Sequence, residues 1–431
     1  MTSDSRPYVV LLGPHPAHFD QARRLGVGII LLDTVKNLAA ETGRYAGRAD
    51  HVIATDYTDV ERVAQLIQVL CRGLDVRGVL ALTEYGLLPA ARMNAILGVK
   101  DNPVEVVRRV VDKHLMRGWL AADQAFALPA REVASARSLQ AFAQEFGAPV
   151  VVKPKDGAGS IGVRVLRDMA EVAAWTPPRN GGSLLAERYV GGSEFSVEAF
   201  SVGGQHLIAA ITEKVLARSA GENGLVEVGH NLPARLDRET DMGLRAFVRD
   251  FLDRLGIREG LSHTEVILGS QGPVIVETHT RNGGDHIADL VLLSTGLDLR
   301  DLAFRSRCDL VRGVPAAPEP TGGAAIRYLT PRPGVVEEID GLDAARYLPG
   351  VVDIDVGVRG GDRVDPLRSS LDRVGYVIAV GADTSQAEQR CLDAVETVKI
   401  RVQRDDAVAP EPAHNGLDAG DLAGASIAPL S

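Results

Sequence analysis

The chain of 431 residues is 45% hydrophobic and 24% charged, and its formal net charge is -10. This composition is that of a soluble globular protein, and the length suffices for two or three domains with sizeable cores. Because a nucleic-acid interface needs a basic surface, the acidic balance argues against nucleic acid as a partner and leaves small molecules.

The first hundred residues have the pattern of an α/β domain. Residues 8–12, 28–33 and 79–82 are short apolar runs typical of buried strands, and helical spacing follows the first and the last of them. This order predicts a parallel sheet. The turns at residues 13–16 and 83–86 follow two of these strands, and open α/β sheets bind ligands at such strand ends. The alternative is that both are simple loop turns.

Two lysines in the next segment are candidates for binding an anion. Helical spacing runs from residue 102 to 120 and includes Lys113, which could equally be an ordinary solvated lysine. Lys153 lies near the end of the apolar strand run 149–154. Burying an unpaired ammonium is costly, so we expect Lys153 to have an anionic partner.

A glycine-rich loop at residues 155–163 follows that strand directly. Gly157 and Gly159, with Ser160 beside them, let backbone N–H groups approach and cradle phosphate oxygens. The spacing differs from the Walker pattern, which needs Gly-Lys-Ser/Thr at the end of the loop. A glycine-rich hairpin without phosphate is the alternative, and Lys153 immediately before the loop favours the phosphate.

A further strand, residues 183–187, leaves through a short connector that contains Tyr189 and Val190. Free backbone N–H and C=O groups in such a connector suit the hydrogen-bonding edge of adenine. Glu194, just beyond it, could accept hydrogen bonds from ribose hydroxyls. An antiparallel run then continues to Lys214, and a break at residues 220–224 predicts a flexible segment near the substrate.

Two strands joined by the turn 269–272 are predicted to pair as a hairpin and to bring Glu265 beside Glu277. Two adjacent carboxylates repel each other unless a divalent cation lies between them, so this pair indicates a metal. Strand alternation places His279 and Arg281 on the same face as Glu277. The guanidinium suits a phosphate or acyl-phosphate oxygen. The alternative is a surface hairpin with an ordinary Glu–Arg ion pair.

The C-terminal third has a different pattern. Residues 287–307 have helical spacing, and 315–323 form a Pro/Gly-rich connector. Residues 324–402 are rich in strands with glycine turns and close with a helix at 385–398. The last stretch, 405–431, is rich in Ala, Gly, Pro and Asp and is predicted to be disordered.

The sequence predicts a cytoplasmic protein. Its three cysteines, Cys71, Cys308 and Cys391, are far apart and have no metal or disulfide spacing, which fits a reducing compartment. The N-terminus lacks an apolar signal core, and no apolar run is long enough to span a bilayer.

Taken in order, these motifs resemble the ATP-grasp superfamily from about residue 8 to residue 402. Each motif is weak by itself, but their combination and order are specific. Within the superfamily the chain is most similar to the carboxylate-amine ligases that include L-amino acid ligases, or dipeptide synthetases. The segments that carry this similarity are residues 228–233 and 326–331.

The resemblance implies an α/β chain with an α+β ATP-grasp fold, using ATP with Mg²⁺, or Mn²⁺ as an alternative. The domains expected are a Rossmann-like parallel-sheet domain at residues 1–105, an ATP-grasp domain of two α+β subdomains at 106–315, and a strand-rich C-terminal subdomain at 316–404. A small lid at about 125–190 belongs to the central domain.

The resemblance also implies a role for each candidate residue. Lys113 and Lys153 would contact ATP phosphates. Glu187 and Val190 would meet the adenine through the connector after residue 187, and Glu194 would meet the ribose. One departure concerns the metal: many ATP-grasp enzymes have Glu-x-Asn where this chain has Glu277-Thr-His279, which puts a second metal ion in doubt. The candidates are Arg281, Lys214 and His230 for catalysis; Lys113, Lys153, Gly157, Gly159, Ser160, Glu187, Tyr189, Val190 and Glu194 for the nucleotide; and Glu265, Glu277 and His279 for the metal.

The function expected is an ATP-dependent ligase that joins a small carboxylate to an amine, such as two amino acids, through an acyl phosphate. A homodimer without a membrane partner is expected. Two alternatives remain: a ligase or carboxylase of nucleotide or biotin-dependent metabolism, and a catalytically silent nucleotide-binding module. The substrate pockets are expected near Glu84, in residues 212–233, around 281–286 and near Arg327.

Overall fold

The computed structural model describes residues 6–13, 16–40, 45, 47–155, 159, 161–178, 183–217 and 225–403. No helix within these ranges is long and apolar enough to cross a membrane. Several features expected from the sequence lie outside the described residues: Gly157, Ser160, the break at 220–224 and the tail 405–431.

The N-terminal domain is a parallel sheet, as its β-α-β order predicts. Its strand order is β3-β2-β1-β4, and the two central strands are buried along nearly their whole length. The elements are β1 (Pro7–Leu12), α1 (Pro16–Arg24), β2 (Gly28–Asp33), α2 (Val35–Ala40), β3 (His51–Ala54), α4 (Val60–Leu70), β4 (Asp75–Ala81), the 3-10 helix η1 (Glu84–Gly86) and α5 (Leu87–Leu97).

The single helix expected at residues 102–120 is two helices, α6 (Val104–Val111) and α7 (Lys113–Leu120). Asp112 separates them with an extended backbone, and its side chain accepts hydrogen bonds from the backbone N–H groups of His114 and Leu115. Because this aspartate caps a new helix, the prediction of one continuous helix is wrong. The break places Lys113 at the first position of α7.

The lid expected at about residues 125–190 is a small antiparallel sheet with strand order β5-β8-β6-β7. Its helices pack on one face and enclose a separate core around Phe142 and Trp175. The elements are β5 (Ala130–Val133), α8 (Ala136–Phe146), β6 (Val150–Pro154), β7 (Arg164–Leu166), α9 (Met169–Ala174) and β8 (Leu184–Arg188).

The central sheet has eight antiparallel strands in the order β13-β12-β9-β10-β11-β14-β18-β16. The last three come from the C-terminal region, so the boundary expected near residue 315 does not separate two sheets. The strands are β9 (Gly192–Val202), β10 (Gln205–Leu216), β11 (Glu227–Leu232), β12 (Gly260–Gly269), β13 (Gly272–His279), β14 (Gly323–Tyr328), β16 (Val351–Val356) and β18 (Gly375–Gly381).

The helix expected at residues 287–307 is also two helices, α11 (Ile287–Thr295) and α12 (Leu299–Arg307). Gly296 ends the first in a left-handed conformation, and Asp298 caps the second, so a single helix was the wrong prediction. The remaining elements are α10 (Arg238–Leu255), β15 (Gly334–Asp340), α13 (Leu342–Arg346), β17 (Arg363–Val364), the 3-10 helix η2 (Ser370–Asp372), α14 (Thr384–Thr397) and β19 (Lys399–Gln403).

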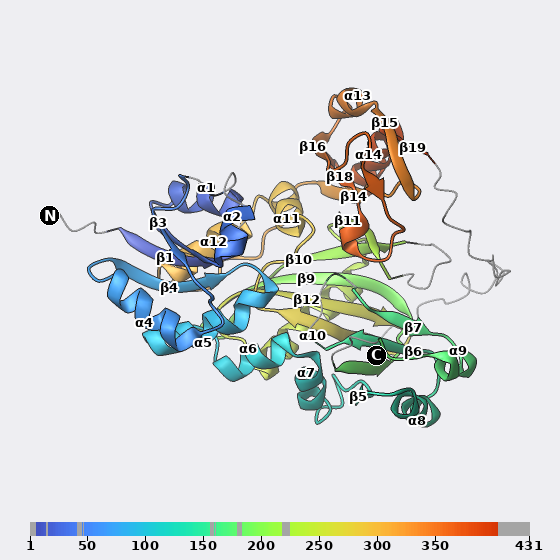
Figure 1. Ribbon diagram of the computed structural model, residues 1–431, viewed down its shortest axis with the longest axis horizontal. Helices are drawn as coiled ribbons and strands as arrows, with labels where there is room; N and C mark the ends of the chain where they lie inside the picture. The colour runs from blue at the N-terminus through green and yellow to red at the C-terminus, as the bar shows by residue number, and fades with distance from the viewer. Residues whose placement is uncertain are drawn as a thin grey trace.

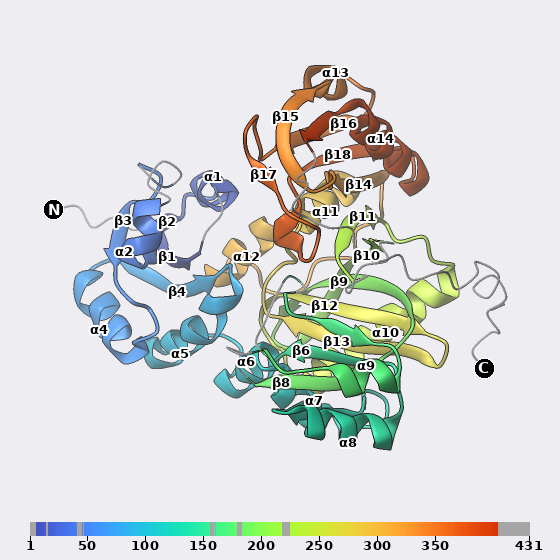
Figure 2. The same cartoon turned by 45° about the vertical axis from the view of Figure 1, so that its right-hand side comes forward.

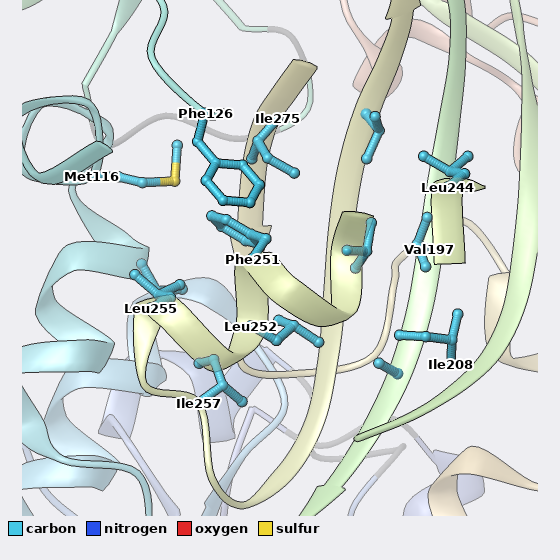
Figure 3. Packing of buried hydrophobic residues seen from close by; sticks show 14 of the residues in the cluster. Met116, Phe126, Val197, Ile208, Leu244, Phe251, Leu252, Leu255, Ile257 and Ile275 are labelled. Atoms are coloured by element: carbon cyan, nitrogen blue, oxygen red, sulfur yellow. The ribbon is translucent and has the colours of Figure 1, made fainter. Parts of the chain in front are cut away.

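The N-terminal domain, the lid and the C-terminal subdomain surround the central strands (Figures 1 and 2). One face of the central sheet packs against α10 and α7, and Phe251 and Met116 meet strand residues such as Val197 and Ile275 there (Figure 3). On β9 and β12 the alternate residues, among them Glu194 and Glu265, point away from this core. Near the β12–β13 hairpin the face opposite this core therefore carries charged groups, whereas Phe200, farther along β9, packs with residues of α11 and α12.

Phe251 lies at the centre of this core with no exposed surface. Replacing Phe251 with Ala should lower the free energy of unfolding by about 3–5 kcal/mol, because it removes a buried ring and leaves a cavity. Denaturant unfolding followed by the fluorescence of Trp119, which packs against the same cluster, measures the effect.

Met242→Ala is the matched control, because Met242 lies on the same helix but is 58% exposed. It should change the free energy of unfolding by less than about 0.5 kcal/mol. Equal effects of the two substitutions would show that α10 does not pack as described.

Candidate active site

The pairing of Glu265 with Glu277 is confirmed. The two residues are directly opposite each other on β12 and β13, which form the hairpin that the sequence predicts. Their side chains are 18% and 16% exposed, and both line the same cleft. Two carboxylates are therefore held side by side in a partly buried position.

A lysine neutralises each of these carboxylates. The Nζ atom of Lys113 lies 2.9 Å from Oε2 of Glu277, and Nζ of Lys214 lies 2.9 Å from Oε1 of Glu265. Burial alone would raise the pKa of both carboxyl groups, but the ammonium groups outweigh it and hold each pKa below its ordinary value. Both carboxylates are therefore ionised at neutral pH.

Lys214 is the centre of a larger cluster. Its Nζ also lies 2.7 Å from Glu227 and 3.8 Å from Glu194. Burial would lower the pKa of Lys214, but the three carboxylates raise it well above its ordinary value. At Glu194 burial dominates and the neighbouring carboxylates add to it, so its pKa is raised to about 6.

Lys153 has the anionic partner that its position predicts. Its Nζ lies 2.8 Å from Oε2 of Glu187, and Arg117 donates to the same carboxylate from Nε at 2.8 Å. Arg117 also donates to the carbonyl of Ile275 in β13 at 2.7 Å. Lys153 and Glu187 both belong to the lid, and Arg117 of α7 joins this pair to β13. The side chain of Glu187 is occupied by these contacts, so we expect its backbone to make the adenine contact.

Arg281 and His279 converge on Glu84, which the N-terminal domain supplies just after β4. Nη2 of Arg281 lies 3.2 Å from Oε2 of Glu84, and Nδ1 of His279 lies 2.7 Å from the same oxygen. The other ring nitrogen of His279 contacts Glu277 at 2.9 Å. Burial would lower the pKa of His279, but Glu277 and Glu84 raise it. Both ring nitrogens of His279 face carboxylates, so its role as a metal ligand stays a prediction, and the metal site that we propose rests on Glu265 and Glu277.

The loop after Arg281 is strained and is held by the C-terminal subdomain. Asp285 and His286 have positive φ angles of 52° and 60°. Arg373 donates to both oxygens of Asp285 at 2.7 Å, and Nε2 of His230 lies 3.3 Å from Oδ2. Non-glycine residues adopt such angles rarely, and residues that do so are enriched at active sites and ligand-binding loops.

The predicted candidates within the described residues are brought to one cleft of about 330 Å³. Arg327 is not part of its lining; it donates to Asn231 at 2.8 Å and also contacts Glu388. The predicted residues in the lining are Lys113, Lys153, Gly159, Glu187, Tyr189, Val190, Glu194, Lys214, His230, Glu265, Glu277, His279 and Arg281.

The residue set suits a hard divalent cation. Mg²⁺ is commonly held by one or two carboxylates, with substrate phosphates and water completing its shell. Glu265 and Glu277 supply two ionised carboxylates, and the lysines beside them suit phosphate oxygens. Among the described residues no group of three or more His, Cys, Asp and Glu side chains could hold a metal ion by itself. A cation bound here would therefore need further ligands from the phosphates of a nucleotide.

Sequence reasoning missed several of these groups. Arg117 lies one helical turn after Lys113, and that spacing could have identified it. Glu198 in β9 and His263 in β12 contact each other beside the cleft. Both interrupt apolar strands, and such charged residues need buried partners. Arg373 gave no signal, because it lies 88 residues from Asp285 in the sequence.

Three family models match the chain in the order of its domains. An ATP-grasp N-terminal domain matches residues 19–99, an ATP-grasp domain matches 146–289, and L-amino acid ligase C-terminal domain 2 matches 327–403. The chain belongs to the ATP-grasp superfamily. The C-terminal match places it with the carboxylate-amine ligases of the L-amino acid ligase type, and ATP use is implied by the fold.

Similar proteins include one that is uncharacterized and two that are described as L-amino acid ligases. An uncharacterized protein of Sinorhizobium fredii is 28% identical over 89% of this chain and 79% of its own length. The L-arginine-specific L-amino acid ligase of Bacillus subtilis is 20% identical over 76% of this chain and 80% of its own. The crystal structure of an L-amino acid ligase from Bacillus licheniformis has a TM-score of 0.78 at 21% identity, covering 93% of this chain and 99% of that one, which establishes the shared fold.

The raised pKa of Glu194 makes the stability of this ATP-grasp protein depend on pH. Its ordinary pKa is 4.5 and its folded value is about 6, so ionising Glu194 costs folding free energy as the pH rises from 4.5 through 6. Glu194→Gln removes this charge and should stabilise the protein by about 2 kcal/mol at pH 7.5 and by much less at pH 5. Calorimetry at both pH values measures the difference.

Glu396→Gln, at an exposed position of α14, controls for loss of a carboxylate and should show no such pH dependence. If Glu194→Gln stabilised the protein equally at both pH values, the pKa of Glu194 would not be raised by burial and by its acidic neighbours.

Proposed function

We propose that this ATP-grasp protein joins a small carboxylate to an amine, consuming ATP and releasing ADP and phosphate. The observation that carries the proposal is the convergence, in one cleft, of the Glu265–Glu277 pair with Lys113, Lys153 and Arg281. Phosphoryl transfer needs positioning and charge neutralisation more than a covalent nucleophile, and this residue set provides both.

Lys113 and Lys153 approach the cleft from different elements and hold the phosphates of ATP. Lys153 comes from the lid, and Lys113 comes from the first turn of α7 beside Glu277. Glu265 and Glu277 would hold Mg²⁺, which would supply neutralisation of phosphate charge. The backbone of the connector after β8 and the Glu194 carboxylate then hold the adenine and the ribose.

Arg281 stabilises the acyl phosphate. The carboxylate substrate attacks the γ-phosphorus, ADP leaves, and the guanidinium donates to the oxygens on which negative charge is concentrated. The amine then attacks the acyl carbon, phosphate leaves, and the nitrogen gives up a proton. Lys214 and His230 line the same cleft and are the further residues proposed for these steps.

Amino acids are the substrates that we propose. The match to the L-amino acid ligase C-terminal domain and the likeness to an L-arginine-specific L-amino acid ligase support them. A screen of amino-acid pairs for phosphate release, with mass spectrometry of the product, tests the proposal. ADP formed without any dependence on a carboxylate and an amine would contradict it. A homodimer and a cytoplasmic location stay predictions.

A catalytically silent nucleotide-binding module is the weaker alternative. Such a module has no need for two adjacent carboxylates, yet Glu265 and Glu277 are both ionised and each has its own lysine. The presence of Arg281 beside them also favours an enzyme.

Glu277→Gln should abolish phosphate release at any Mg²⁺ concentration, because it removes half of the charge offered to the metal. The midpoint of thermal unfolding should fall as well, because buried Lys113 loses its partner at 2.9 Å. Glu337→Gln is the control, because Glu337 is an exposed residue of β15, and it should leave both quantities unchanged. Near-normal activity of a folded Glu277→Gln protein would contradict the metal assignment.

Hydroxylamine in place of the amine should trap the acyl phosphate as a hydroxamate, with ADP released in step. Arg281→Ala should slow this trapping by about 100-fold or more, as expected for a lost oxyanion donor. Arg281→Lys keeps the charge but not the planar fork, so its effect should be smaller. Equal trapping by Arg281→Ala and the unmodified protein would remove Arg281 from the mechanism.

A further inference from the structure

Glu198 is the most deeply buried carboxylate of the cleft region. It lies in β9 with none of its surface exposed, although burying a carboxylate is costly unless it has a partner. The partner is His263, which lies directly opposite on β12, and Oε1 of Glu198 contacts Nδ1 of His263. The proposed reaction uses neither residue.

Both members of the pair have a second contact, and each contact leads to the active site. Nε2 of His263 lies 3.4 Å from Oε1 of Glu265, the carboxylate proposed to hold the metal. Oε2 of Glu198 accepts a hydrogen bond from the backbone N–H of Gly283 at 3.0 Å. Gly283 follows Arg281 by two residues, so one chain of contacts joins the metal carboxylate to the arginine loop.

The surroundings hold the His263 ring in one orientation. A Cβ atom at Gly283 would lie 2.7 Å from Nδ1 of His263 and 2.9 Å from Oε1 of Glu198, so the loop passes as close as glycine allows. The ring also stacks on that of His279, with centroids 5.9 Å apart and an interplanar angle of 21°. A ring held on these sides can keep a fixed direction toward Glu265.

We propose that Glu198 and His263 are positioning residues that aim the Glu265 carboxylate at a divalent cation and hold the Arg281 loop in register with it. The ring lies between two carboxylates, with Nδ1 toward Glu198 and Nε2 toward Oε1 of Glu265, which leaves the second oxygen of Glu265 for the cation. Partners behind a metal ligand commonly orient it in this way. This inference rests on the metal role of Glu265 in the proposed function.

Two substitutions of His263 separate positioning from general packing. Asparagine places its amide near the position of Nδ1 and keeps a donor for Glu198, whereas glutamine reaches the position of Nε2 and keeps a donor for Glu265. Calorimetric titration with ADP, in the presence of Mn²⁺ and in the presence of a chelator, gives the gain in ADP affinity due to the metal. This readout needs no turnover.

His263→Asn should reduce the metal-dependent gain by about 10- to 100-fold, the usual cost of losing an outer partner of a metal ligand. His263→Gln should keep most of the gain, and metal-free ADP binding should be the same in both variants. His206→Asn is the matched control: His206 is a buried histidine of β10 in the same sheet, bonded to Ser201 at 2.7 Å and outside the cleft. It should leave the gain unchanged.

The proposal would be overturned if His263→Asn showed the same metal-dependent gain in ADP affinity as the unmodified protein. It would also be overturned if the Asn and Gln variants lost this gain equally. Gly283→Ala gives a second route that leaves His263 in place, because the added methyl group would push the pair apart. It should also reduce the metal-dependent gain, and an undiminished gain would overturn the proposal even if His263→Asn fails to fold. If Mn²⁺ gives no gain with the unmodified protein, the metal role of Glu265 is itself wrong, and this inference is overturned with it.

Discussion

Two carboxylates placed side by side on neighbouring strands need positive charge beside them, and the arrangement of the cleft follows from this need. The pairing of Glu265 with Glu277 is fixed by the hairpin register, so the side chains cannot avoid each other. Lys113 and Lys214 supply the compensating charge without ligand. A divalent cation bound between these carboxylates would supply the same compensating charge, and Lys113 would then be available for phosphate oxygens.

The same requirement explains why the site is built from several parts of the chain. Lys153 comes from the lid, Glu84 from the N-terminal domain and Arg373 from the C-terminal subdomain. Glu84 is paired with Arg281 and Arg373 with Asp285, whereas the lid pair of Lys153 and Glu187 is joined to the central hairpin through Arg117 of α7. The active site therefore exists only when the surrounding domains are correctly placed, and the ion pairs between them contribute to that placement.

The local patterns were sufficient to predict much of the fold and part of the site. The apolar strands and their turns predicted the parallel N-terminal sheet and the Glu265–Glu277 hairpin, because each depends on residues close in sequence, whereas the lid was expected only from the family resemblance. The helices at 102–120 and 287–307 were predicted without their breaks, because the spacing of apolar residues continues across Asp112 and Gly296. The pairing of Asp285 with Arg373 depends on tertiary packing, which a single sequence does not encode in any local signal. The joining of β14, β18 and β16 to the central sheet was missed for the same reason.

The central claim is that this cleft transfers the γ-phosphoryl group of ATP to a substrate carboxylate. The most direct test uses an amino-acid pair that the protein joins, with ¹⁸O in the carboxylate of the acyl donor, and mass spectrometry of the released phosphate and nucleotide. An acyl phosphate passes one labelled oxygen to inorganic phosphate, with ADP as the nucleotide product, and this is the result that the account predicts. Label in AMP, with pyrophosphate as the other product, would contradict it.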